Sequence, residues 1–178
     1  MPQVVYYVAT SLDGYIASVD GSVEWLRPFQ EQGEDHGATA LHASVDALLL
    51  GSHTYEFALQ LGQWPAPDKP SWVFTQRNLQ VLHPSITLTR QSPADVVNLL
   101  ASRGYQRAWL MGGGKLAASF HSDQLISQYI ISVFPVLLGC GVPLFAPHAS
   151  PPDTLRLVST TRFKSGIVQL TYEHVRNA

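Results

Sequence analysis

The sequence contains a single cysteine, Cys140, and only 13% of its 178 residues are charged. One cysteine cannot form an internal disulfide framework, which fits a reducing compartment. We expect it to be a small apolar filler in a strand or turn rather than a reactive thiol. The formal net charge is −2 without a long run of one sign, so we expect neither a nucleic-acid partner nor binding to an anionic membrane surface.

Long hydrophobic segments and metal-ligand spacings are also missing. The longest apolar run, residues 129–138, is interrupted by Ser132 and Pro135 and is far too short to span a bilayer. Residues 1–7 lack the basic region and cleavage site of a signal peptide and look like a first strand. No two of the seven histidines stand four residues apart with a carboxylate, so we expect no metal site. The sequence therefore favours a soluble, cytoplasmic protein.

Strand and helix patterns alternate through the first 128 residues, and the length suits one domain over residues 1–178. Strands are expected at 4–9, 47–51, 71–75 and 108–111, helices at 34–45, 52–61, 92–103 and 115–120, and a long loop at 10–22. Later segments have strand patterns without helices between them, at 130–138, 154–161 and 167–175. This order predicts an α/β fold of three α/β/α layers, with a mostly parallel sheet and antiparallel C-terminal strands.

Three consecutive glycines, Gly112 to Gly114, lie between an expected strand and the expected helix at Lys115. Without Cβ atoms the backbone can approach a ligand closely, and the start of the helix offers free N–H groups to a phosphate. The spacing is neither the G-x-G-x-x-G fingerprint nor a Walker P-loop. Taken alone, the cluster is either a pyrophosphate site or a tight glycine-rich turn.

Two other expected strands also end in small and polar residues. One is followed by Gly51-Ser52-His53-Thr54-Tyr55, and another ends in Thr75-Gln76-Arg77. Ligands of open parallel sheets bind outside the carboxyl ends of the strands. Three such ends would cradle an extended dinucleotide, with the Arg77 guanidinium suited to a 2′-phosphate. The alternative for Arg77 is a solvated loop charge.

Four segments in this order resemble the dihydrofolate reductase-like family that contains the RibD C-terminal domain. Residues 9–17 resemble its S-L-D-G-x-I-A signature, and residues 45–55 its V-D-A-x-x-x-G-x-x-T-Y segment. The glycine cluster follows, and residues 135–145 resemble its P-V-L-L-G-x-G-x-P-L-F strand. The resemblance implies the dihydrofolate reductase fold, NADPH as hydride donor, and a pocket between the first loop and the helix before Asp46.

The resemblance also implies roles for single residues. Ala9 and Ile16 would lie near the nicotinamide, and Thr54, Thr75 and Arg77 would hold the adenosine end. Gly113, Gly114, Lys115 and Leu116 would hold the pyrophosphate. The whole implied cofactor site is Ala9, Ile16, Gly51, Ser52, His53, Thr54, Thr75, Gln76, Arg77, Met111, Gly112, Gly113, Gly114, Lys115 and Leu116.

The substrate site is expected at Asp13, Trp25 and Tyr55. Trp25 falls near a tryptophan that closes the active-site loop in dihydrofolate reductases, or else it is a loop aromatic packed on the core. Hydride transfer to C=N or C=O also requires a proton. In dihydrofolate reductases an acid on the helix before the second strand has this role, and the matching position is Asp35. Alternatively, Glu34 and Asp35 are acids at a helix N-terminus, and Asp13 is a second candidate or a turn residue.

Three departures from the family pattern narrow the function. Ser52 stands where many relatives have Arg, which leaves the choice between NADPH and NADH open. Met111 and Gly112 replace an acid of the riboflavin-pathway reductases, and residues 56–60 lack their D-x-P substrate segment. We therefore expect an NADPH-dependent reductase of a small pterin, pyrimidine or flavin-like compound, acting as a homodimer through its C-terminal strands. The alternative is a non-catalytic nucleotide-binding protein.

Overall fold

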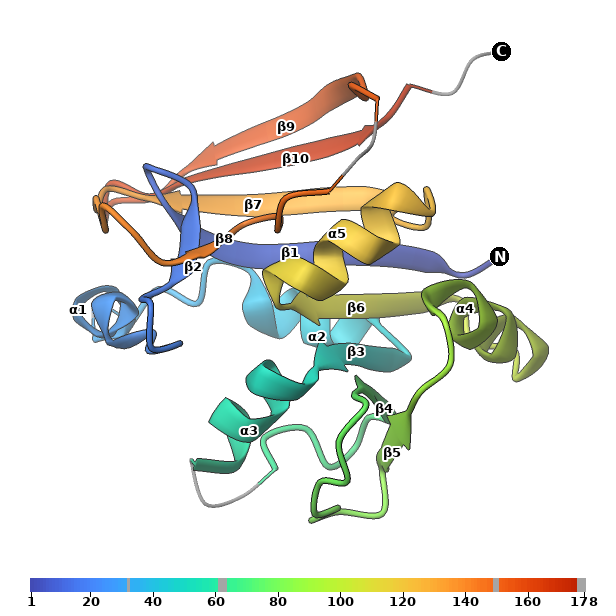
Figure 1. Ribbon diagram of the computed structural model, residues 1–178. Coiled ribbons are helices and arrows are strands. Elements are labelled where there is room, and N and C mark those ends of the chain that lie inside the picture. The colour runs from blue at the N-terminus through green and yellow to red at the C-terminus, as the bar shows by residue number, and fades with distance from the viewer. Residues whose placement is uncertain (32, 61–63, 149–150, 176–178) are drawn as a thin grey trace.

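An eight-stranded sheet runs through the middle of the molecule, between helices on its two faces (Figure 1). The computed structural model describes residues 1–31, 33–60, 64–148 and 151–175. The strands of the sheet are β1 (Gln3–Ser11), β3 (Ala47–Gly51), β4 (Ser71–Phe74), β5 (Ile86–Thr89), β6 (Arg107–Gly112), β7 (Gln128–Phe134), β9 (Leu155–Arg162) and β10 (Val168–His174). The helices are α1 (Arg27–Gln30), α2 (Ala38–Ser44), α3 (Ser52–Gln60), α4 (Pro93–Ser102) and α5 (Gly114–Ser122), preceded by a 3-10 turn, η1 (Glu24–Leu26).

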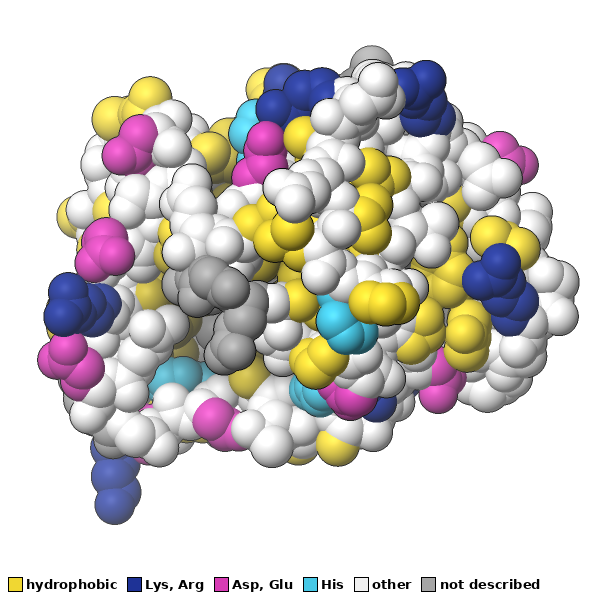
Figure 2. Space-filling model, turned by 90° about the horizontal axis from the view of Figure 1, so that it is seen from below, with side chains coloured by type: hydrophobic (Ala, Val, Ile, Leu, Met, Phe, Trp, Pro, Cys, Tyr) yellow, Lys and Arg dark blue, Asp and Glu magenta, His cyan; other side chains and the backbone are white. Residues whose placement is uncertain are grey.

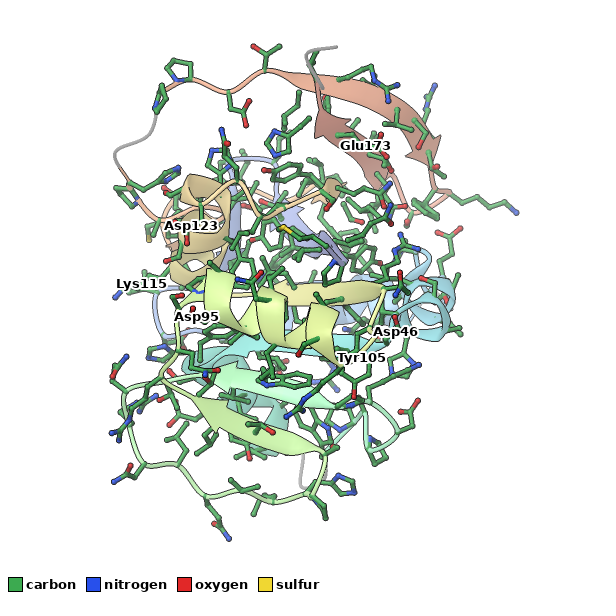
Figure 3. The ribbon with its side chains drawn as sticks, turned by 90° about the vertical axis from the view of Figure 1, so that its right-hand side faces the viewer. Asp46, Asp95, Tyr105, Lys115, Asp123 and Glu173 are labelled. Carbon is green, nitrogen blue, oxygen red and sulfur yellow. The ribbon has the colours of Figure 1, made fainter. Side chains whose placement is uncertain are left out.

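The strand order is β5-β4-β3-β6-β1-β7-β10-β9. All neighbours from β5 to β7 pair in parallel, whereas β10 runs antiparallel to β7 and to β9. In the side view, β4 and β5 lie at one end of the sheet, and the β9–β10 hairpin with Glu173 lies at the other (Figure 3). The predicted α/β fold is confirmed, with one refinement: the segment expected at 130–138 ends at Phe134 and pairs in parallel with β1.

Both faces of the sheet are buried around its central strands, such as β3, because successive side chains of a strand point to opposite faces and both sets are hydrophobic there. In β3, Ala47 and Leu49 pack in a core with residues of α4 and α5. Leu48 and Leu50 pack in a second core with residues of α2 and α3. These two cores lie on opposite faces of the sheet and produce the three predicted layers.

The helix expected at 34–45 is shorter, because it starts only at Ala38. His36 and Gly37 have φ angles of 52° and 87°, and neither angle fits a right-handed helix. Residues 34–37 therefore form a loop. Asp35 lies just before the helix, where its carboxylate accepts the N–H groups of Gly37 (3.0 Å) and Thr39 (3.1 Å).

Three strands were not expected from the sequence. One is β5, and the other two are β2 (Tyr15–Ala17), inside the expected loop 10–22, and β8 (Val142–Pro143), which pair with each other. The helix expected at 92–103 is confirmed as α4, where the Asp95 N–H donates to the Ser92 hydroxyl (3.2 Å; Figure 3). The end expected at Leu61 for α3 lies outside the described residues.

The surface is mixed in character. On the face shown in Figure 2, charged side chains of both signs are scattered among polar and hydrophobic ones. Cys140, expected as a packed filler, is instead exposed. Of the helices in the described ranges, none is long and apolar enough to cross a membrane.

Candidate active site

The carboxyl ends of β3, β4, β5 and β6 open onto one groove, which we call the strand-end groove. Its volume is about 630 Å³. The turns after these strands form most of its wall, at residues 51–54, 74–76, 89–91 and 113–116. The three turns that the sequence marked as a dinucleotide cradle therefore lie side by side, and the turn after β5 joins them.

Two of the three consecutive glycines are explained by the chain's own folding. Gly112 has a φ of 109°, which side chains rarely tolerate. A Cβ atom on Gly114 would overlap the carbonyl oxygen of Pro143, and the Gly114 carbonyl accepts the N–H of Ala146 at 3.0 Å. Gly112 therefore allows the backbone angle of the β6–α5 turn, and Gly114 allows this turn to pack against residues 143–146.

Gly113 differs from both neighbours. Its φ is −89°, which any residue adopts, and a Cβ atom there would lie 3.8 Å from Thr54 Oγ1 and 3.9 Å from Ile16 Cδ1. These are ordinary contact distances, so no neighbouring atom excludes a side chain here. The missing side chain keeps the floor of the groove open where the β3 and β6 ends meet.

The first turn of α5 borders the groove. Its first backbone bond is donated by Ala117 to the Gly113 carbonyl, so the amides of residues 114–116 have no acceptor within the helix. Lys115, labelled in Figure 3, lies in this turn and lines the groove. The positive end of the helix dipole and the lysine together favour an anionic group.

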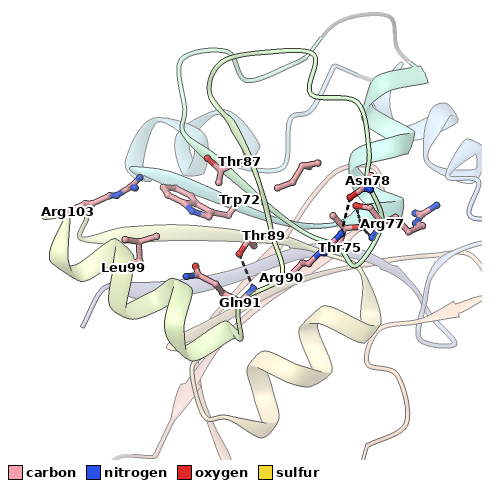
Figure 4. Close-up of a pocket in the computed structure, with 11 residues that line it drawn as sticks. Trp72, Thr75, Arg77, Asn78, Thr87, Thr89, Arg90, Gln91, Leu99 and Arg103 are labelled. Atoms are coloured by element: carbon pink, nitrogen blue, oxygen red, sulfur yellow. Dashed lines mark hydrogen bonds between the residues drawn. The ribbon is translucent and has the colours of Figure 1, made fainter.

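A basic cavity of about 580 Å³ adjoins the groove at β4 and β5 and shares Thr75 and Arg90 with it (Figure 4). Arg77 lines only this cavity, and its Nη2 lies 2.6 Å from Glu56 Oε2. The Arg90 Nη2 donates to the neutral amide oxygen of Asn78 (2.9 Å). Sequence reasoning missed Arg90 because it missed β5, although the alternating Ile-Thr-Leu-Thr segment before the α4 start was a usable signal.

On the other side, the groove continues into a central cavity of about 800 Å³, with which it shares His53, Thr54 and Gly113. The central cavity also contains the expected nicotinamide neighbours Ala9 and Ile16, and it reaches Met111, Tyr7 and Leu26.

A smaller cavity of about 430 Å³ lies beyond it and shares Tyr7, Ala9 and Leu26 with it. We call it the acidic cavity, because Glu34 and Asp35 line it. The amides of Gly37 and Thr39, and the hydroxyl of Thr39, lower the pKa of Asp35, so the carboxylate is ionised at neutral pH.

His36 also lines the acidic cavity, and the sequence gave no sign of it. The residue is 8% exposed, and its ring packs edge-on against Phe134 and Phe163. Its Nε2 is buried without a hydrogen-bond partner in the described part of the chain. The carbonyl of His36 accepts bonds from Tyr7 Oη (3.1 Å) and Gln169 Nε2 (2.8 Å), which hold its left-handed backbone.

Three expected substrate residues lie elsewhere. Tyr55 is fully buried and donates to the Gln80 carbonyl (2.8 Å), so the structure gives it a packing role. Asp13 joins two loops: it accepts bonds from the Ser11 hydroxyl and from the amides of Leu138 and Gly139. Trp25 packs edge-on against Phe134, which lines the acidic cavity, and leaves its buried Nε1 unpaired among the described residues.

This sheet, with its ligand-sized cavities at the strand ends, can be compared with known proteins. The model of the RibD C-terminal domain family matches residues 2–169. The chain belongs to this family. The family predicted from the four motifs is thereby confirmed.

Two of the relatives are matched over nearly their whole length, and a third over just over half of its length. The uncharacterized protein YwjB of Bacillus subtilis (strain 168) is 36% identical, over 96% of this chain and 97% of its own length. A Shewanella sp. PV-4 protein named for riboflavin biosynthesis is 30% identical, with a TM-score of 0.86 over 99% of this chain and 100% of that one. The deaminase/5-amino-6-(5-phosphoribosylamino)uracil reductase of Thermotoga maritima shares the fold, with a TM-score of 0.72 and 16% identity over 98% of this chain and 57% of that one.

Proposed function

We propose that the protein is an NADPH-dependent reductase that transfers a hydride to a small heterocyclic substrate. The observation that best supports this is the bare backbone at Gly113, where the strand-end groove meets the central cavity. No neighbouring atom of the chain excludes a side chain there, and the bare backbone would let a ligand pass close along the groove. Membership of the RibD C-terminal domain family supports the same class of reaction.

The residues present fit an extended dinucleotide. The free amides at the start of α5 and the Lys115 ammonium suit its pyrophosphate, and Thr75, Thr89 and Arg90 line the groove where it adjoins the basic cavity. Ala9 and Ile16 line the central cavity, where a nicotinamide ring would face the substrate. Bound NADPH would supply the hydride.

The substrate would lie in the acidic cavity, because this cavity adjoins the central cavity through Tyr7, Ala9 and Leu26. An ionised Asp35 is better suited to hold an N–H group of the substrate than to give up a proton. We therefore propose that Asp35 orients the substrate. Asp35→Asn should then raise KM more than it lowers kcat, and unchanged kinetics would remove this residue from the site.

Gly113→Ala tests the cofactor assignment. The added methyl group would occupy ligand space, so we expect the Kd for NADPH to rise roughly tenfold or more, measured by titration of nucleotide fluorescence. The new Cβ would meet only ordinary contacts within the chain, and the thermal melting temperature is measured beside the Kd to separate a loss of binding from a loss of folding.

Gly104→Ala is the matched control, since Gly104 has a φ of 80° and follows α4 away from the groove. It should cost about 1 kcal/mol of stability and leave the Kd unchanged. Equal NADPH binding by wild type and Gly113→Ala would sink the cofactor assignment. Tight NADPH binding without oxidation by any pterin, pyrimidine or flavin would favour the non-catalytic nucleotide-binding protein.

A further inference from the structure

The charged side chains that line the acidic cavity and the central cavity are all carboxylates among the described residues. Carboxylates of Glu34 and Asp35 line the acidic cavity, and those of Asp20, Glu24 and Glu56 line the central cavity. None of the described residues that line either cavity is Lys or Arg. Glu56 is paired with Arg77 outside these cavities, but Glu34 and Asp35 face the acidic cavity without a lysine or arginine beside them there.

A phosphorylated substrate fits such a cavity poorly. Phosphate groups in proteins are held by Arg, Lys or clusters of backbone N–H groups. Here the amides nearest to the carboxylates are already used, because Gly37 and Thr39 donate to Asp35 and Ser165 donates to Glu34. A phosphate would therefore meet like charge, with no lysine or arginine among the described lining residues to compensate for it.

The walls of the acidic cavity suit a flat ring. The rings of Phe29 and Phe134 pack edge-on with their centroids 5.1 Å apart, and Tyr7 lines the same cavity. Aromatic rings of this kind pack well against planar ligands and attract cationic ones. The volume of about 430 Å³ lies within the range of about 300–1,000 Å³ that is usual for small-molecule sites.

His36 supplies an independent sign of a ligand. Its side chain is 10% exposed and lines the cavity, and its Nε2 lies 4.0 Å from Glu34 Oε2 without a hydrogen-bond partner in the part of the chain that the structure describes. Buried polar atoms are nearly always hydrogen-bonded. The unpartnered Nε2 is accounted for if it binds a polar atom of a ligand in the cavity, whereas the left-handed backbone is held by Tyr7 and Gln169.

We propose that the acidic cavity binds an unphosphorylated, neutral or cationic nitrogen heterocycle, held by the carboxylates of Glu34 and Asp35 and by His36 Nε2. This names the substrate class of the proposed reductase and rests on that function. It also separates this chain from the Thermotoga maritima relative, whose name includes a phosphoribosylamino substrate.

Two compounds that differ only in one phosphate test the proposal: 5-amino-6-(5-phosphoribosylamino)uracil and its dephosphorylated form. Calorimetric titration, with and without saturating NADPH, should show that the dephosphorylated compound binds at least about tenfold more tightly. In the Glu34→Gln/Asp35→Asn double variant this preference should fall severalfold. His36→Phe should weaken both compounds alike, since it removes a bond to the ring rather than a repulsion from the phosphate.

Glu31→Gln is the matched control for charge, because Glu31 pairs with Arg27 on exposed α1 and does not line the cavity. It should leave both affinities unchanged. Tighter binding of the phosphorylated compound overturns the proposal. If Lys164→Gln then abolishes that tighter binding, the Lys164 ammonium holds the phosphate, since the Lys164 backbone lies beside Glu34. Failure of both compounds and of 2,4-diaminopyrimidine to bind also overturns it.

The same titrations separate this inference from the proposed function. If a heterocycle binds as expected but NADPH does not bind, the reductase assignment fails and the cavity assignment stands. If NADPH binds but the phosphorylated compound is preferred, the reductase assignment stands and the substrate class fails.

Discussion

At the scale of single residues, the two arginines beside the strand-end groove differ in the charge of their partners. Arg77 is paired with the carboxylate of Glu56, whereas Arg90 is bound to the neutral Asn78 amide. The charge of the Arg90 guanidinium is therefore not offset by this partner and is available to a 2′-phosphate. A phosphate is a strong hydrogen-bond acceptor for a guanidinium group. The preference for NADPH that Ser52 left open would then depend on Arg90.

Arg90→Ala should raise the Kd for NADPH about tenfold and leave the Kd for NADH unchanged, both measured by calorimetry. Arg77→Ala serves as the comparison and should affect the two nucleotides alike. Equal losses of NADPH and NADH affinity in Arg90→Ala would show that Arg90 does not contact the 2′-phosphate.

At the scale of secondary-structure elements, Asp13 connects the first loop to the loop after β7. Hydrogen bonds from the Ser11 hydroxyl, and from the amides of Leu138 and Gly139, hold the pKa of Asp13 below its ordinary value. The unfolded chain binds a proton at that carboxyl near pH 4, and the folded chain binds it only at lower pH. The stability that Asp13 contributes is therefore fully present above about pH 5 and is lost as the pH falls through the folded pKa.

Asp13→Asn should consequently lower the urea midpoint at pH 7 and have a smaller effect at pH 3. Asp123→Asn, at the end of α5, removes a carboxylate elsewhere on the surface and is the control with which the Asp13 variant is compared at each pH. A deficit of the Asp13 variant that is equally large at both pH values would contradict the role of the ionised carboxylate.

Elements with a strong local signal could be predicted, and those that depend on contacts far along the chain could not. A few neighbouring residues are enough to indicate three of these elements: the glycine cluster, the Ser92–Pro93 helix start and the apolar β3. By contrast, β2 exists because it pairs with β8, more than a hundred residues later. The first turn expected for the helix at 34–45 is replaced by a loop in which Tyr7 and Gln169 bind the His36 carbonyl.

The residues of the candidate site divide in the same way, into those that the local sequence indicates and those that depend on distant contacts. Residues on strand-to-helix turns, such as Thr54 and Gly113, were found because their position follows from the order of elements. Arg90 was missed together with its strand, and His36 was missed because its position depends on a loop that distant residues hold. Tyr55 was marked by its motif, and the fold buries it, which local sequence could not show.

At the scale of the whole molecule, β9 forms one end of the sheet, and its outer edge pairs with no strand in the described ranges. Most of its residues are exposed, including Leu157 at 50% and Val158 at 44%. An edge of this length carries unpaired backbone N–H and C=O groups that favour pairing with another chain. We propose that two copies associate through these C-terminal strands around a two-fold axis.

Light scattering should then give a mass near twice the 19.5 kDa of one chain. Leu157→Lys combined with Val158→Lys should shift the protein to the monomer, because charged residues on an edge strand oppose pairing. Leu82→Lys changes a leucine that is 46% exposed in the segment before β5, and it should leave the mass unchanged because it lies at the other end of the sheet. A wild-type monomer at micromolar concentration would exclude the dimer, whereas a dimer that survives the β9 substitutions would place the interface on another face.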